Sequence, residues 1–293
     1  MLKQILTFFT LLSMTLVAPA LAQEQTNHDG SKPYPIQRKE VVFERDGLKI
    51  AGVLYLPMTD KPVPAIILSH GFGGNFAVYE WGYCPVMAQN GIAACAFDFC
   101  GGGRESKSDG KSTEMSVLTE AKDLSAVLDA IRKTPEIDPD NVFLLGESQG
   151  GFVSSYVAAS RPDDVRGLVA VFPAYVIQDD AKKRAPNLDK APDTMDVMGM
   201  KLGKIYNADA QSFDIYEMLP NFKRNVLIMH GTVDTLVPIS YSERAVKAFP
   251  HAELVKFEGS GHGFFGDAGK RAIDLAIDFV KKNVKQPEEG SDK

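Results

Sequence analysis

Short apolar runs alternate with amphipathic stretches along most of this chain. The short runs, rich in β-branched residues, are typical of strands that are buried on both faces of a sheet. The predicted strands are residues 38–45, 48–56, 63–69, 92–98, 141–146, 167–172, 225–230 and 254–257. The predicted helices are residues 79–89, 117–131, 150–160 and 271–284. Strands that alternate with helices indicate an α/β fold with a mostly parallel sheet and helices on both faces.

The first two predicted strands differ from the others because they flank the dipeptide Asp46-Gly47. Asp-Gly between two strands favours a tight two-residue turn. Residues 38–56 are therefore predicted to form an antiparallel hairpin ahead of the parallel strands.

Strand 141–146 runs into Gly146-Glu147-Ser148-Gln149-Gly150, a Gly-x-Ser-x-Gly pattern. Small residues around Ser148 allow a buried strand to turn abruptly into a helix, with the hydroxyl at the apex of the turn. Ser148 is therefore the candidate nucleophile. The pattern alone also fits an ordinary strand-to-helix turn, so its chemistry depends on what the other strands bring to it.

A serine nucleophile needs a base within hydrogen-bond reach and a third group that orients the base. In a parallel sheet, the loops that follow the strands converge at the carboxyl ends of the strands. His262 follows the last predicted strand and is the candidate base, whereas His251 precedes that strand and belongs to the opposite edge. Asp234 follows the strand before it and is the candidate acid, with Asp209 and Asp214 as alternatives earlier in the chain.

Acyl transfer also requires hydrogen-bond donors for the oxyanion of the tetrahedral intermediate. The glycine-rich residues 70–74 follow strand 63–69 and let the backbone approach a reacting carbonyl group. The backbone N–H groups of Phe72, in this loop, and of Gln149, directly after Ser148, are the candidate donors. By itself the loop also fits a simple glycine-rich turn.

Residues 173–220 form a segment that is too long for an ordinary connection between two elements. The segment is charged at first and then contains several methionines. We expect an inserted cap with a small hairpin or helices of its own, and the alternative is a long surface loop. Tyr175, Met198 and Tyr206 are the candidate substrate contacts in this cap, although a methionine cluster also suits a local core.

The N-terminus has the pattern of a signal peptide, with Lys3, an apolar run at 5–17 and small residues at Ala20 and Ala22. The apolar run is shorter than the ~20 residues that cross a bilayer, so cleavage near Ala22 is favoured over an anchor. We therefore expect an exported protein, periplasmic or secreted, whose mature chain has no stable membrane insertion. The predicted organisation continues with a polar leader at 23–36, one domain at 37–285 and a polar tail at 286–293.

Charge and cysteine content narrow the possible partners. The 293 residues carry a formal net charge of −6 and contain no block of lysines and arginines, which argues against a nucleic-acid partner. Small-molecule chemistry is expected instead, and no metal or organic cofactor is implied. Cys84, Cys95 and Cys100 allow at most one disulfide, and none of them occupies a turn like that of Ser148, so a catalytic cysteine is not expected.

In kind and in order, these motifs resemble those of the α/β-hydrolase superfamily. Residues 37–285 carry the resemblance through His70-Gly71-Phe72-Gly73, Gly146-Glu147-Ser148-Gln149-Gly150, His230-Gly231-Thr232-Val233-Asp234 and Gly261-His262-Gly263. Residues 97–106 and the insertion after Phe172 are further similar to bacterial cinnamoyl/feruloyl esterases, which hydrolyse esters of hydroxycinnamic acids beneath a cap over the acyl pocket. Those esterases often have Asn-Gly-His-Gly where this chain has Cys100-Gly101-Gly102-Gly103.

The resemblance implies an exported serine carboxylesterase that acts on a small-molecule ester through Ser148, His262 and Asp234. Other acyl hydrolases share such a triad, so a prolyl-oligopeptidase-like peptidase, a thioesterase and a deacetylase are alternatives. A dienelactone-type hydrolase is disfavoured because it would use a cysteine nucleophile. A non-catalytic binding protein on a hydrolase fold is the alternative from a different class. The acyl group, the alcohol and the oligomeric state stay open.

Overall fold

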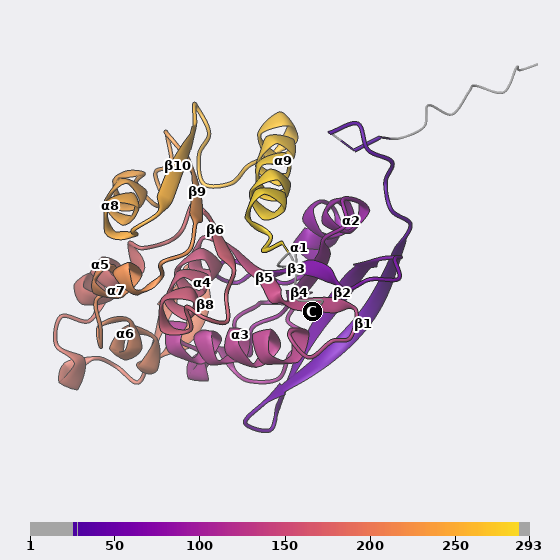
Figure 1. The fold of residues 1–293 in the computed structure, drawn as a ribbon. Coiled ribbons are helices and arrows are strands. Elements are labelled where there is room, and N and C mark those ends of the chain that lie inside the picture. The colour runs from indigo at the N-terminus through magenta and orange to yellow at the C-terminus, as the bar shows by residue number, and fades with distance from the viewer. Residues whose placement is uncertain (1–25, 28, 287–293) are drawn as a thin grey trace, which may run out of the picture.

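The computed structural model describes residues 26–27 and 29–286 of the chain (Figure 1). The predicted signal peptide, residues 1–22, lies outside the described residues, as do residues 287–293 of the predicted tail. No helix in the described part of the chain is long and apolar enough to cross a membrane.

The main sheet has the mostly parallel arrangement that the apolar runs predict. Its strands are β1 (Ile36–Arg45), β2 (Leu48–Pro57), β3 (Val63–Ser69), β4 (Ala93–Phe97), β5 (Ile137–Glu147), β6 (Gly167–Val171), β9 (Val226–Gly231) and β10 (Ala252–Phe257). Their order across the sheet is β1-β2-β4-β3-β5-β6-β9-β10. β2 is antiparallel to β1 and β4, and every pairing from β4 to β10 is parallel. The predicted α/β fold class is therefore confirmed.

Helices cover both faces of this sheet (Figure 1). The α-helices outside residues 173–220 are α1 (Ala77–Glu80), α2 (Tyr83–Gln89), α3 (Val117–Ile131), α4 (Gln149–Ser160), α8 (Ser240–Ala248) and α9 (Gly266–Asn283). α3, α4 and α8 share one buried cluster with alternate strand residues such as Ala65 and Ile67. α1, α2 and α9 share the other cluster with Ile66 and Leu68. Successive side chains of β3 thus pack into the cores on opposite faces of the sheet, which is why its sequence is mostly apolar.

Several element boundaries differ from the predictions. The helix predicted at 79–89 is split into α1 and α2, because the chain leaves the helical conformation at Gly82 (φ −150°, ψ −87°). α8 was not predicted, and it buries only Ser242 and Ala245, which leaves little apolar periodicity to detect. α9 begins at Gly266 rather than at residue 271.

The segment 173–220, called the cap segment below, contains short helices and a hairpin. Its elements are α5 (Ile177–Arg184), β7 (Thr194–Val197), β8 (Met200–Gly203), α6 (Ile205–Ala210) and α7 (Ile215–Met218). The hairpin turns at Met198-Gly199, both with positive φ, as a tight two-residue turn requires. Met200, Leu202 and Tyr206 pack with Met115 in a small core of their own. In Figure 1 the cap segment gathers beside α4.

Candidate active site

Ser148 lies at the sharp turn between β5 and α4. Its backbone has φ 52° and ψ −118°, a conformation that residues other than glycine rarely adopt. The flanking glycines are required by close packing. A Cβ at Gly146 would lie 2.2 Å from the carbonyl oxygen of Gly150, and a Cβ at Gly150 would lie 2.1 Å from that of Ser69. The Gly-x-Ser-x-Gly pattern therefore corresponds to a strained turn that holds Ser148 at the carboxyl end of β5.

The three residues predicted as nucleophile, base and acid form one hydrogen-bonded chain. His262, in the loop after β10, has its Nε2 atom 2.9 Å from Ser148 Oγ. The Nδ1 atom of His262 is 2.7 Å from Oδ2 of Asp234, in the loop after β9. Three strand ends that are far apart in the sequence thus meet at one edge of the sheet. This geometry allows His262 to accept the proton of Ser148 while Asp234 fixes the ring tautomer.

Asp234 is held rigidly by its own loop. Its Oδ1 atom accepts hydrogen bonds from the backbone N–H groups of Leu236 and Val237, both at 2.9 Å. Its side chain is fully buried. Oδ2 is therefore the oxygen left to face His262. The alternative acids serve other contacts: Asp209 is hydrogen-bonded to the Ser116 hydroxyl, and Asp214 caps α7.

The two candidate oxyanion donors lie on either side of Ser148. Gln149 is the first residue of α4, and N–H groups in the first turn of a helix have no acceptor within the helix. The N–H of Phe72 has no acceptor among the described residues. Both residues line the same cavity as Ser148.

The Phe72 loop is fixed from the neighbouring strand end. The N–H of Gly73 donates to the carbonyl oxygen of Gly102 at 3.1 Å. Asp98 accepts hydrogen bonds from the backbone N–H groups of Phe76 and Lys107, both at 2.7 Å. Asp98 thus joins the segment after Phe72 to the loop after β4.

Comparison with known families agrees with this geometry. A family model described as "Serine aminopeptidase, S33" matches residues 60–212, just over half of the chain. The chain belongs to this family of α/β-hydrolases. A second model, described as "TAP-like protein", matches residues 210–291 of the hydrolase, the part that contains Asp234 and His262.

Solved structures and curated proteins add relatives of the hydrolase. Est1E from Butyrivibrio proteoclasticus, in a structure with ferulic acid bound, is 26% identical over 83% of this chain and 96% of that chain, with a TM-score of 0.72. The quorum-quenching protein AidA of Acinetobacter baumannii is 27% identical over 43% of this chain, and the match spans only 40% of AidA. Caffeoylshikimate esterase of Arabidopsis thaliana is 27% identical over 58% of this chain and 53% of its own length. The hydrolase is thus similar to feruloyl esterases.

A cavity of about 70 Å³ opens beside Ser148. Met198 and Tyr206 of the cap segment, two of the candidate substrate contacts, line it. Tyr175 does not line it, because its buried hydroxyl lies 2.8 Å from Ser155 Oγ in the core of the hydrolase. The assignment of Tyr175 as a substrate contact is therefore corrected. The other lining residues are Phe72, Gln149, Ala174, Val176, Ile177, Asp180, Arg184, Val197, Leu236 and Val237.

His230 is a residue of the site whose role was not predicted from the sequence. It lies in β9, four residues before Asp234, and its Nε2 is 2.9 Å from the carbonyl oxygen of Val237 and 3.3 Å from Asp234 Oδ2. Its Nδ1 lies 2.7 Å from the Ser242 hydroxyl. Burial lowers the pKa of His230, so the ring is neutral, with Nε2–H donating towards the acid loop. The spacing of His230 and Asp234 at a strand end is the signal that could have revealed it.

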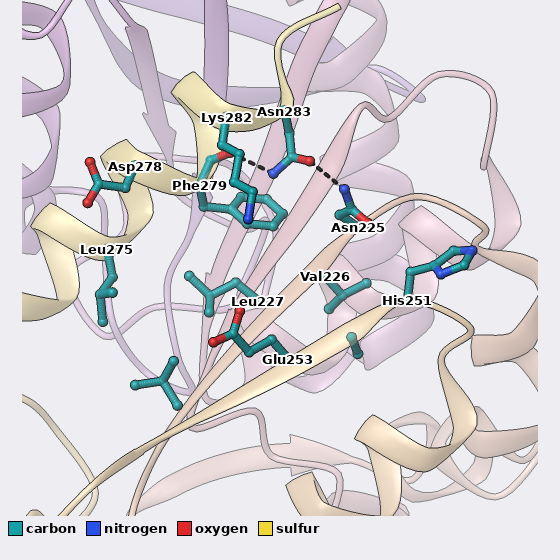
Figure 2. A pocket seen from close by; sticks show the side chains of 12 residues that line it. Asn225, Val226, Leu227, His251, Glu253, Leu275, Asp278, Phe279, Lys282 and Asn283 are labelled. Carbon is teal, nitrogen blue, oxygen red and sulfur yellow. Dashed lines mark hydrogen bonds between the residues drawn. The ribbon is translucent and has the colours of Figure 1, made fainter.

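A second cavity lies at the opposite edge of the sheet, where β9 and β10 begin (Figure 2). Figure 2 shows Asn283 of α9 accepting a hydrogen bond from Asn225 at 2.5 Å and donating one to the Phe279 carbonyl oxygen at 2.8 Å. His251 lines this cavity, in agreement with its predicted place away from the carboxyl ends of the strands. Its lining residues include no serine or cysteine that could act as a nucleophile.

Possible metal ligands are dispersed among the described residues, and the three cysteines are buried. Within residues 26–27 and 29–286, no group of three or more His, Cys, Asp and Glu side chains could hold a metal ion. Cys84, Cys95 and Cys100 are all free and buried. Burial raises the pKa of the Cys100 thiol to about 12, so it stays protonated.

Glu147 is a half-buried residue directly before Ser148, and its carboxyl group is desolvated. Burial raises its pKa to about 7, while a contact with the Tyr79 hydroxyl acts in the opposite direction. Its ordinary pKa is 4.5, so the folded state binds the proton more tightly than the unfolded state does. Folding stability is therefore lost as the pH rises from about 4.5 through 7.

Glu147→Gln is expected to remove this loss, because a neutral amide costs little to keep desolvated at any pH. Its stability advantage over the wild type should grow between pH 5 and pH 8 by on the order of 2 kcal/mol. Urea unfolding at the two pH values measures it. Glu253→Gln, at an exposed position on β10, is the control and should show no such growth. An equal advantage at both pH values would contradict the role of Glu147.

Proposed function

We propose that this hydrolase is a serine carboxylesterase with Ser148 as nucleophile, His262 as general base and acid, and Asp234 as orienting acid. The observation that carries the proposal is the unbroken hydrogen-bonded chain from Asp234 Oδ2 through both nitrogens of His262 to Ser148 Oγ. A serine held in this way is activated at neutral pH, whereas an isolated serine is a poor nucleophile. The family and the esterase relatives support the same chemistry.

The reaction proceeds in two halves. Ser148 Oγ attacks the ester carbonyl carbon as its proton passes to His262 Nε2, and the carbonyl oxygen becomes an oxyanion beside the N–H groups of Phe72 and Gln149. Collapse of this intermediate breaks the bond to the alkoxy oxygen, which receives the proton from His262 and leaves as the alcohol. Water, deprotonated by His262, then attacks the acyl-enzyme. Collapse of this second intermediate breaks the bond to Ser148 Oγ, which takes the proton back from His262, and releases the carboxylic acid.

We propose a hydroxycinnamoyl or similar small acyl ester as the substrate. Most of the cavity wall is apolar, with side chains such as Ile177, Val197 and Leu236. A structure of the relative Est1E has ferulic acid bound, and another relative is named caffeoylshikimate esterase. Comparing kcat/KM for acetyl, octanoyl and feruloyl esters tests this preference, and hydrolysis of the acetyl ester alone would sink the hydroxycinnamoyl proposal.

Arg184 is the charged side chain that we expect to bind the polar end of the acyl group. It lines the cavity, and no carboxylate of the described residues lies within 4.0 Å of its guanidinium. Its Nε donates to Asn207 Oδ1 at 3.1 Å, which fixes its direction. Arg184→Gln should lower kcat/KM for a feruloyl ester roughly tenfold, since a hydrogen bond to a charged donor is lost. The acetyl ester should be unaffected, and the exposed neighbour substitution Lys183→Gln should change neither.

The serine aminopeptidase description of the family supports a second candidate, an aminopeptidase. Adding an aminoacyl anilide to the substrate panel separates the two, because we expect only a peptidase to cleave its amide bond at an appreciable rate. We also propose export, on the pattern of residues 1–22. The intact mass of the protein recovered outside the cytoplasm would then lack that segment.

A further inference from the structure

The side chain of Gln149 is clamped between α3 and the cap segment. Its Nε2 donates to Glu120 Oε2 at 2.8 Å, and its Oε1 accepts a hydrogen bond from the Tyr206 hydroxyl at 2.7 Å. All three side chains are buried. These hydrogen bonds fix the position of the glutamine side chain, because breaking either one would leave a buried polar group unsatisfied.

Tyr206 also touches the other candidate oxyanion donor. Its ring centroid lies 6.0 Å from that of Phe72, and the two rings are tilted against each other. Tyr206 belongs to α6 of the cap segment, whereas Phe72 follows β3 and Gln149 begins α4. One cap residue therefore contacts both residues whose N–H groups would hold the oxyanion.

Glu120 supports the same two residues from the other side. A Cβ at Gly102 would lie 2.8 Å from Glu120 Oε1, so the carboxyl group rests against this glycine. Gly102 in turn accepts the hydrogen bond of Gly73, the neighbour of Phe72. Burial raises the pKa of Glu120 well above its ordinary value, which favours the neutral form of the carboxyl group. A neutral acid still accepts the hydrogen bond of Gln149 and adds no negative charge beside an oxyanion.

We propose that Glu120 and Tyr206 are positioning residues that hold Gln149 and Phe72 in place as oxyanion donors. The packing of the cap segment against Gln149 and Phe72 thereby completes the oxyanion site that stabilises the transition state. This inference rests on the proposed esterase function. It extends that function by giving the cap segment a part in catalysis besides the lining of the cavity.

Tyr206→Phe is the main test, because it removes only the hydroxyl group and keeps the ring against Phe72. Loss of a whole oxyanion donor costs ~10²–10³-fold in kcat, so a displaced donor should lower kcat roughly tenfold. KM should stay within about twofold, since ground-state contacts are kept. Inhibition by an arylboronic acid, which forms a tetrahedral adduct on a nucleophilic serine, should weaken roughly as much as kcat falls.

Glu120 is tested with a conservative pair. Glu120→Gln keeps a neutral acceptor for Gln149 and should retain kcat within about threefold, whereas Glu120→Leu should lower it at least as far as Tyr206→Phe. Tyr216→Phe is the matched control, since this cap tyrosine bonds the Tyr241 carbonyl oxygen at 3.0 Å and does not line the cavity. It should leave kcat and boronate inhibition unchanged. Thermal unfolding of each variant shows whether it is folded.

Three results would overturn the inference. The first is a folded Tyr206→Phe variant that retains both kcat and boronate affinity. The second is a rise in KM alone, which would make Tyr206 a substrate contact only. Glu120→Gln could also lose as much activity as Glu120→Leu, which would exclude a role as neutral acceptor. The esterase function itself is judged separately, on the wild type: without ester hydrolysis and without fluorophosphonate labelling of Ser148, that function fails before any of these variants is compared.

Discussion

Ser148→Ala is expected to lower kcat for a short nitrophenyl ester by a factor on the order of 10⁶. The substitution removes the only atom that would form the acyl-enzyme, while His262 keeps its bond to Asp234. Alanine cannot be labelled by a fluorophosphonate, so labelling should disappear together with hydrolysis. Discontinuous assays at high enzyme concentration measure the residual hydrolysis, and mass spectrometry after exposure to the fluorophosphonate measures the labelling.

Ser154→Ala is the matched control for this loss. Ser154 lies on α4, six residues after Ser148, and its buried hydroxyl has no hydrogen-bond partner among the described residues. Its removal should leave hydrolysis and labelling intact. Undiminished labelling of Ser148→Ala would mean that another residue is the nucleophile.

The nucleophile turn and the strand ends could be predicted because they follow from backbone rules. Gly146 and Gly150 are required by contacts of about 2 Å that no Cβ could occupy, so the glycines around Ser148 report the turn directly. His262 and Asp234 follow apolar strands, and the parallel sheet brings such loops to one edge. Each of these inferences needs only local sequence and strand direction.

Residues whose roles depend on packing between distant segments could not be predicted. Tyr175 and Tyr206 look alike in the sequence, yet one bonds Ser155 in the core and the other faces the cavity. Their orientation is decided by how the cap segment folds onto α3 and α4, which no periodicity reveals. Glu120 stands on the buried face of α3 between apolar positions, and only its contact with Gln149 shows why a carboxyl group is there.

Asp234→Asn is expected to lower kcat about 10⁴-fold at neutral pH while leaving the fold intact. Oδ1 of Asp234 accepts two backbone N–H groups, so an asparagine must place its oxygen there and turn its NH₂ group towards His262. The Nδ1 atom of His262 would then accept a hydrogen bond, and its proton would move to Nε2. A histidine that carries its proton on Nε2 cannot take the proton of Ser148.

The matched substitution Asp214→Asn separates this effect from a general loss of a carboxylate. Asp214 caps α7 through the N–H of Tyr216 at 2.8 Å, and asparagine caps a helix equally well. Its activity should therefore equal that of the wild type.

Nearly full activity of folded Asp234→Asn would show that another group orients His262. His230 is the neighbour to examine in that case, but its Nε2 already faces the Val237 carbonyl oxygen at 2.9 Å and lies 3.3 Å from the same Asp234 oxygen that His262 contacts. Because no other carboxylate of the described residues pairs with His262, the effect of Asp234→Asn measures the orienting role of this one residue.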